Sequence, residues 1–123
     1  MIAEYFDQEG YLLVKVNVAW TTEVAIQLID ETRDEALNRG HHLILFDLRQ
    51  WASPSSEMTR FYSGEHLAKV FKYQYKVAAF ANKKDITRFG EIVAVNRGAS
   101  FRIFADEQSA IQWLIEGSSE APK

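Results

Sequence analysis

Cysteine is absent from all 123 residues, so disulfides, thiolate metal sites and a cysteine nucleophile are excluded. Long apolar runs are absent too: LLVKVNVAW contains Lys15 and Asn17, far short of the roughly 20 apolar residues that cross a bilayer. The N-terminus carries Glu4 and Asp7 and lacks the basic start and apolar run of a signal peptide. We therefore expect a mature chain that begins here, a cytoplasmic location and no membrane span.

An excess of basic residues is also missing. The chain has 14 Lys and Arg against 17 Asp and Glu, a net charge of −3, whereas nucleic-acid binding needs a basic surface. Of the three histidines, His41 and His42 are neighbours in an expected strand and point to opposite faces, and His66 has no acidic ligand one turn away. The sequence predicts no nucleic-acid partner and no metal site.

Catalytic motifs are equally scarce. The chain has no Gly-x-Ser-x-Gly elbow, no glycine-rich phosphate loop, and no histidine placed by sequence beside a serine and an acid. We expect no enzymatic activity and no cofactor. A hydrolase that uses Asp47 or Ser55 is the weakest alternative.

The chain has enough hydrophobic residues to form one core. Hydrophobic residues make up 47% of the sequence, which suits a single domain over residues 1–117. The polar end, SSEAPK, predicts a flexible tail over residues 118–123.

The first half of the chain alternates between strand and helix signals. Two apolar runs, 2–6 and 11–20, flank the turn DQEG and predict a hairpin. Thr21 or Thr22 can cap the next helix, and Gly40 can end it. The run LILF, which leads into Asp47, is apolar on both faces and predicts the centre of the sheet.

The second half repeats the alternation. We expect a helix over 54–71 with a bend or a division into two pieces near Gly64, and then a strand over 76–81 and a helix over 87–97. A strand over 100–104 and a last helix, capped by Asp106 and ending at Gly117, complete the chain. The order ββαβαβαβα predicts an α/β domain with a mixed, mostly parallel sheet of about five strands and four helices.

With this order, the chain resembles the STAS domains, the sulfate-transporter and anti-sigma-factor-antagonist superfamily, and within it the SpoIIAA-like group. The resemblance rests on LILFDLRQW, VAAFANKKDITRFGEIVAVNRG and FRIFADEQSAIQWL and covers nearly the whole chain. It implies a bacterial-type regulatory domain that binds a protein partner.

In the antagonists, a strand-end aspartate precedes an Asp-Ser-Ser-Gly or Asp-Ser-Gly element whose serine a partner kinase phosphorylates. By this resemblance Asp47 matches the strand-end aspartate and Ser55 the phosphorylated serine. Pro54 replaces the aspartate before that serine, and Ser56 and Glu57 stand where glycine is expected. The phosphoserine motif is therefore not intact.

The stretch over 47–61, which we call the junction, holds the remaining candidates. Ser53 before Pro54 has the order of a helix cap followed by a first-turn proline, which would leave Ser55 and Ser56 in the first turn. A phosphate there could be held by Arg49 or Arg60. Trp51 either folds back onto the core or marks a contact surface.

We interpret the protein as a non-enzymatic regulatory or protein-interaction domain. Exposed edge strands and aromatic residues also make a homodimer an open alternative. The expected interaction surface comprises Asp47, Arg49, Trp51, Ser55, Ser56, Arg60 and Phe61.

The alternative function is a carrier or sensor of a small apolar or lipid-like ligand. Its pocket would lie between the second helix, the third helix and the sheet. Aromatic residues gather around the second helix and its exit; core packing explains most of them, and a pocket or partner surface there is the alternative. These residues are Tyr62, Phe71, Tyr73 and Tyr75.

Overall fold

A computed structural model of the chain describes residues 2–51, 56–71, 75–86 and 89–116, with only the backbone at 89 and 90. The predictions that concern Ser53, Ser55, Tyr73, Gly117 and the 118–123 tail lie outside the described residues.

One five-stranded sheet organises the molecule, with its strands in sequence order. The first two strands are antiparallel, and every later neighbouring pair is parallel. This confirms the predicted α/β class and the mostly parallel sheet. The strands are β1 (Ala3–Gln8), β2 (Tyr11–Val16), β3 (Leu43–Asp47), β4 (Lys76–Phe80) and β5 (Phe101–Phe104).

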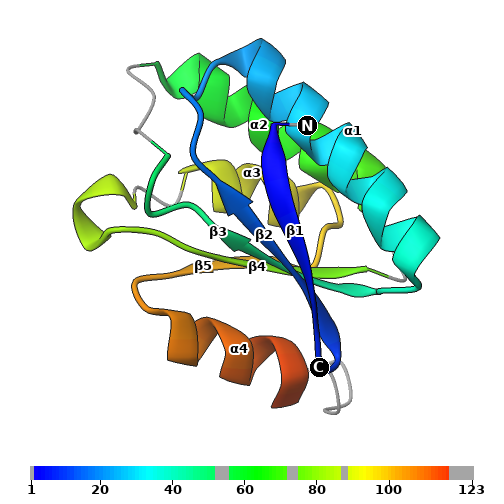
Figure 1. The fold of residues 1–123 in the computed structure, drawn as a ribbon. Coiled ribbons are helices and arrows are strands. Elements are labelled where there is room, and N and C mark those ends of the chain that lie inside the picture. Colours follow the sequence, from blue (N-terminus) through cyan, green and yellow to red (C-terminus); the bar gives the residue numbers. More distant parts are fainter. Residues whose placement is uncertain (1, 52–55, 72–74, 87–88, 117–123) are drawn as a thin grey trace.

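Helices cover both faces of this sheet (Figure 1). Helices α1, α2 and α3 lie on one face, and α4 lies on the other. Right-handed crossovers between sequential parallel strands put their helices on one side, whereas α4 follows the last strand. None of the described helices combines the length and the apolar character that crossing a membrane requires. The helices are α1 (Thr22–Arg39), α2 (Glu57–Val70), the short 3-10 helix η1 (Lys83–Asp85), α3 (Phe89–Asn96) and α4 (Glu107–Glu116).

Three helix ends confirm the local predictions. The hydroxyl of Thr21 accepts a hydrogen bond from the Val24 amide, and Gly40 ends α1 with a left-handed φ of 76°. Asp106 accepts hydrogen bonds from both the amide and the hydroxyl of Ser109 at the start of α4. Each signal is local, because the cap bonds to a residue within one turn.

The start of α2 differs from the prediction. The helix begins at Glu57, and the N-cap is Ser56, whose hydroxyl accepts a hydrogen bond from the Met58 amide at 3.1 Å. Ser56, which was predicted to lie in the first turn, is therefore the N-cap of α2. Ser56 followed by Glu57 is an equally good cap with an acidic first-turn residue, and the sequence offers both. Helix α2 runs unbroken through Gly64, so it is not divided into two helical pieces there.

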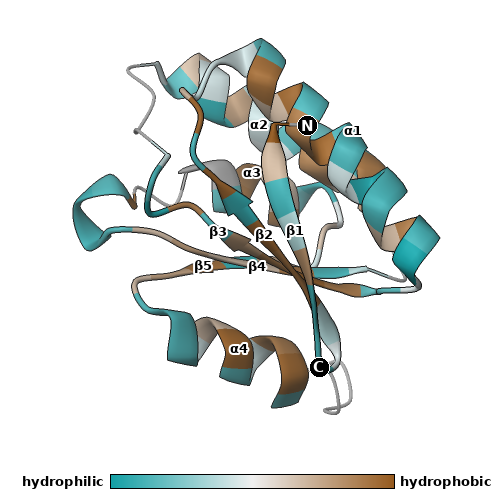
Figure 2. Cartoon of the chain, viewed as in Figure 1, coloured by the Kyte–Doolittle hydropathy of each residue, from teal (hydrophilic) through white to brown (hydrophobic). Residues whose placement is uncertain are grey.

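Strand side chains alternate between two apolar cores. Leu12, Val14 and Val16 of β2 face the core beneath α1 and α2, and Leu13 faces the core beneath α4. In β3, Ile44 and Phe46 face the first core and Leu45 the second, so the strand is buried on both faces as predicted. Figure 2 shows this pattern as brown along the crossing strands and teal on the outward edge of α1.

A buried polar contact ties α1 to the edge strand β1. The hydroxyl of Tyr5 donates to the Glu31 carboxylate at 2.7 Å and lies 3.3 Å from the hydroxyl of Thr32. Thr32 is fully buried. Burial raises the pKa of the Tyr5 phenol, and the contact with Thr32 opposes this while the contact with Glu31 adds to it.

Candidate functional site

The junction begins with a closed carboxylate–guanidinium pair. Arg49 donates to Asp47 through Nε at 3.0 Å and Nη2 at 2.8 Å, and its backbone amide donates to Asp47 at 3.2 Å. Burial by itself would raise the pKa of Asp47, but these bonds and the charges of Arg49 and Lys15 outweigh it and lower that pKa. Asp47 therefore remains ionised and holds the loop that follows β3.

Further backbone bonds hold this loop against β4. The Leu48 amide donates to the Phe80 carbonyl, and the Trp51 amide donates to the Leu48 carbonyl. The side chain of Asn82 donates to the Arg49 carbonyl at 3.1 Å. These hydrogen bonds fix the position of the loop, and with it the position of Trp51.

Trp51 is folded back onto the core. Its side chain is only 6% exposed, and its ring stacks on Trp20 with centroids 4.3 Å apart and planes 12° apart. Trp20 Nε1 donates to the Ser63 hydroxyl at 3.4 Å. Trp51 Nε1 is buried and has no hydrogen-bond partner among the described residues. Trp51, which was predicted among the residues of an interaction surface, is therefore buried inside the protein.

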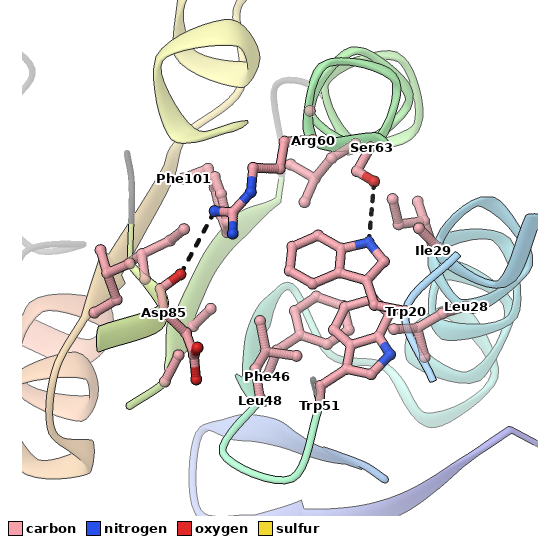
Figure 3. Close-up of a pocket in the computed structure, with 17 residues that line it drawn as sticks. Trp20, Leu28, Ile29, Phe46, Leu48, Trp51, Arg60, Ser63, Asp85 and Phe101 are labelled. Atoms are coloured by element: carbon pink, nitrogen blue, oxygen red, sulfur yellow. Dashed lines mark hydrogen bonds between the residues drawn. The ribbon is translucent and has the colours of Figure 1, made fainter. Parts of the chain in front are cut away.

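The two indoles border a cavity of about 90 Å³ (Figure 3). Its floor is a row of paired strand residues, Phe46, Ala79 and Ile103, which lie side by side in β3, β4 and β5. Ala79 lies between the large side chains of Phe46 and Ile103. Ala81, two residues further along the chain, also lines the cavity. The cavity exists because these alanines fill little of the space under the helices.

One face of α2 forms the opposite wall. Arg60, Ser63, Gly64 and Leu67 recur at three- and four-residue spacing, so they lie on the same face of the helix. The start of α1 closes the cavity beside them. The cavity lies near the carboxyl ends of β3 and β4, the usual place for ligand sites in open α/β sheets. The described lining consists of Trp20, Ala25, Leu28, Ile29, Phe46, Leu48, Trp51, Arg60, Ser63, Gly64, Leu67, Ala79, Ala81, Asp85, Ile86, Phe101 and Ile103.

Two charged residues reach this otherwise apolar cavity. Arg60 is only 9% exposed; its Nη1 donates to the Asp85 backbone carbonyl at 3.5 Å, and its guanidinium lies 5.7 Å from the Trp20 ring centroid. In Figure 3 the Arg60 side chain extends from α2 toward Asp85, across the cavity from Trp51. Asp85 belongs to η1 and also lines the cavity.

The outer face of α2 carries a small apolar strip, Met58 and Tyr62. Met58 is 54% exposed and Tyr62 is 43% exposed, and they lie one turn apart. Phe61 is half-buried beside them. It contacts the Tyr62 ring edge-on at 5.5 Å between centroids, and the Arg97 guanidinium lies 5.2 Å from its centroid.

Comparison with known proteins identifies the architecture. No family model and no curated protein matches the sequence. The crystal structure of an anti-sigma factor antagonist from Mycobacterium paratuberculosis is similar in fold, with a TM-score of 0.63. The match is 13% identical in sequence and covers 91% of this chain and 92% of that one. The chain has the STAS fold. The resemblance in the sequence is therefore confirmed at the level of fold.

The fold places the described site residues in four different locations. Trp51 and Arg60 line the cavity, Asp47 and Arg49 pair in the loop before it, and Ser56 caps α2. Phe61 lies on the side of α2 near α3. Ser55 lies outside the described residues. Among the described ones, Asp47, Trp51 and Arg60 are buried.

Sequence reasoning missed Trp20, Ser63 and Asp85. In the sequence, Trp20 was interpreted only as the end of a strand. Its position directly before a helix cap could have marked this large aromatic residue as a candidate for the site. The cavity lies between the second helix and the sheet as predicted, but the described lining draws on α1 and not on α3. Phe71 is buried and packs against Tyr75 at 5.2 Å as part of the core, as core packing of the aromatic residues around the second helix predicts.

The described residues include no group of three His, Asp or Glu side chains that could hold a metal ion. His66 instead contacts Asp30 of α1 at 2.8 Å, and His41 contacts Asp7 at 2.8 Å. Both histidines bridge secondary-structure elements.

Proposed function

We propose that the protein is a non-enzymatic regulatory domain that binds a protein partner. The observation that supports this most is the fold match to an anti-sigma factor antagonist over 91% of the chain. The exposed residues of the junction and of the outer face of α2 form the proposed contact surface. Arg49, which is half exposed, and the strip Met58 and Tyr62 supply its charged and apolar contacts.

The apolar strip is the part of this surface that a partner would bury. Exposed apolar side chains that cluster beside charged ones are typical of interaction sites. Met58 lies within the junction and Tyr62 directly follows it, and the family resemblance leads us to expect partner contacts in the junction. Trp51 is excluded from the contact surface because it is buried.

Site-specific photocross-linking in native lysate tests this proposal. A photoreactive phenylalanine at position 58 or 62 should capture the same protein, and Tyr62→Glu should reduce capture from position 58. The matched control is position 37, because Leu37 is 68% exposed on α1. Equal capture from all three positions, or none from 58 and 62, would refute a specific partner surface on α2.

Partner binding is proposed to be independent of phosphorylation at Ser55. The aspartate and glycine of the family motif are absent around that residue, where Pro54, Ser56 and Glu57 stand instead. Ser55→Ala and Ser55→Glu should therefore leave cross-linking from position 62 unchanged. A large loss with Ser55→Glu alone would instead indicate a phosphoswitch.

A second function, carrier or sensor of a small apolar ligand, is favoured by the cavity between α2, α1 and the sheet. A pocket with apolar walls and a few polar groups is the usual form of a small-molecule site. Native mass spectrometry of gently purified protein should show a bound mass, and ligands should raise the melting temperature. Absence of both effects across a lipid and fatty-acid panel would rule out this function.

A further inference from the structure

The two edges of the sheet differ in how their backbone groups are bonded. Strand β5 forms one edge and β1 the other (Figure 1). In β5, the carbonyls of Ser100 and Phe104 accept from β4 amides, so the amide of Ile103 points away from β4. That amide donates to the Glu91 carboxylate of α3 at 2.6 Å. A helix side chain therefore occupies an outward amide of β5, which is one way in which proteins protect a sheet edge.

The β1 edge has no such protection within the described part of the chain. Gln8 pairs with Tyr11 across the two-residue turn, and this pair carries the hydrogen bond of the turn. Bonded and non-bonded pairs alternate along an antiparallel ladder, so every second residue of β1 points its N–H and C=O groups away from β2. No described residue bonds to these outward groups, which belong to Ala3, Tyr5 and Asp7.

We propose that the β1 edge binds an extended segment of a partner protein, in which basic residues alternate with apolar ones, as a sixth strand of the sheet. Strand addition of this kind uses the exposed backbone groups of an edge strand for affinity and the alternating side chains for specificity. This site is separate from the proposed contact surface on α2 and does not depend on it.

The charge around β1 favours a basic segment. Helix α1 lies against β1, where the Tyr5 hydroxyl donates to Glu31. Together β1, its turn, the neighbouring residue of β2 and residues 31–39 of α1 hold three more acidic than basic residues. A second copy of β1 would bring acidic strand against acidic strand, which is unfavourable. The acidic residues are Glu4, Asp7, Glu9, Glu31, Asp34 and Glu35, and the basic ones are Lys15, Arg33 and Arg39.

The two faces of β1 set the order of the partner's side chains. Tyr5 lies on the face toward the acidic residues of α1. On the opposite face α4 packs mainly on β3, β4 and β5, and Phe6 is 39% exposed with Lys15 Nζ 5.5 Å from its ring centroid. Neighbouring residues of paired strands share a face. The partner's basic residues therefore fall beside Tyr5 and its apolar residues beside Phe6.

Nuclear magnetic resonance on the whole chain tests the inference with a probe peptide, acetyl-Lys-Val-Lys-Val-Lys-Val-amide. The probe should slow hydrogen exchange at the amides of Ala3, Tyr5 and Asp7. It should leave the amides of Glu4 and Phe6 unchanged, since these already bond to β2. No slowing at the three outward amides, up to the solubility limit of the probe, would overturn the inference. Protection of these amides before the probe is added, with a dimer by light scattering, would assign the edge to a second copy instead.

Two matched peptides separate the backbone contribution from the charge contribution. The same peptide N-methylated at every residue keeps its side chains but loses its backbone donors, and it should not bind. The peptide with Glu in place of Lys should bind about tenfold more weakly, and added salt should weaken the Lys peptide. Binding of the N-methylated peptide would overturn strand addition, and equal binding of the Glu peptide would overturn the basic preference.

Variants locate the effect on β1. Glu4→Gln combined with Glu9→Gln should weaken binding of the Lys peptide severalfold, and Phe6→Thr should weaken it by removing the apolar contact. The matched control Glu57→Gln, at an exposed acid on α2, should leave binding unchanged. Equal loss with the control would indicate general attraction to an acidic protein and overturn the site. Circular dichroism checks folding, and if a variant fails to fold, the three peptides on the wild-type chain decide.

Discussion

The rings of Trp20 and Trp51 stack with centroids 4.3 Å apart and planes 12° apart. Trp20 precedes α1 and Trp51 follows β3, so the stack joins two connections at the same edge of the sheet. It fixes one wall of the cavity and the path of the chain into the junction.

Removing this stack should destabilise the fold. Trp51→Ala should lower the free energy of unfolding by about 3 kcal/mol or more, as for other buried aromatic truncations. Trp51→Phe should cost within about 1 kcal/mol, because the apolar body stays and the change removes a buried N–H that has no partner among the described residues. Urea unfolding measures both changes. If Trp51→Ala cost no more than the exposed control Met58→Ala, the ring would not anchor the loop.

Ser56 should stabilise the start of α2. Ser56→Ala removes the acceptor for the Met58 amide and should cost about 1 kcal/mol. Ser53→Ala, the change at the cap predicted from sequence, should cost less, because α2 begins at Glu57. Thermal and urea unfolding of both variants measure the difference. A greater cost for Ser53→Ala would place the helix start earlier.

The pair of Asp47 with Arg49 should make stability depend on acid pH. The folded-state pKa of Asp47 is below the ordinary value of 3.8, so the folded state binds fewer protons than the unfolded state between the two values. Its contribution is complete above 3.8 and is lost as pH falls through the folded-state pKa.

Urea unfolding from neutral pH into the acid range, on wild type and Asp47→Asn, measures this dependence. The two free energies of unfolding should converge as pH falls. Arg49→Gln serves as the second variant and should show the same convergence. A gap between wild type and Asp47→Asn that stays constant down to the lowest pH would contradict the assignment.

Tyr5 should stabilise the contact of α1 with β1. Tyr5→Phe removes the hydrogen bond to Glu31 and should cost about 1 kcal/mol at neutral pH. Because the folded-state pKa of Tyr5 is raised, the unfolded phenol ionises first, and stability falls as pH rises above 10.0. Unfolding at neutral and alkaline pH measures both effects. Equal alkaline loss in wild type and Tyr5→Phe would show that Tyr5 is not responsible.

Much of the fold could be predicted because its signals are local. The caps at Thr21 and Asp106 and the stop at Gly40 bond within one turn, and the alternation along β2 needs only the neighbouring residues. The cap of α2 was mispredicted because Ser53 and Ser56 offer equivalent local chemistry. Which serine caps depends on where the helix can pack its inner face against the sheet.

The candidate site was predicted only in part. Arg60 and Trp51 were among the predicted site residues, but they were predicted to lie on an interaction surface. In the structure they line the cavity. Nothing near Trp51 in the sequence indicates that Trp20 lies against it, since stacking requires both connections to reach the same edge.

The sequence by itself determined the order of strands and helices, most of their ends, and the absence of cysteine and basic excess, because these depend on composition and on neighbours along the chain. Tertiary structure decided that Ala79 lies between Phe46 and Ile103, and that Arg60 faces them from α2. Register and helix packing bring these distant residues together, and the space that the small alanines do not fill becomes the cavity.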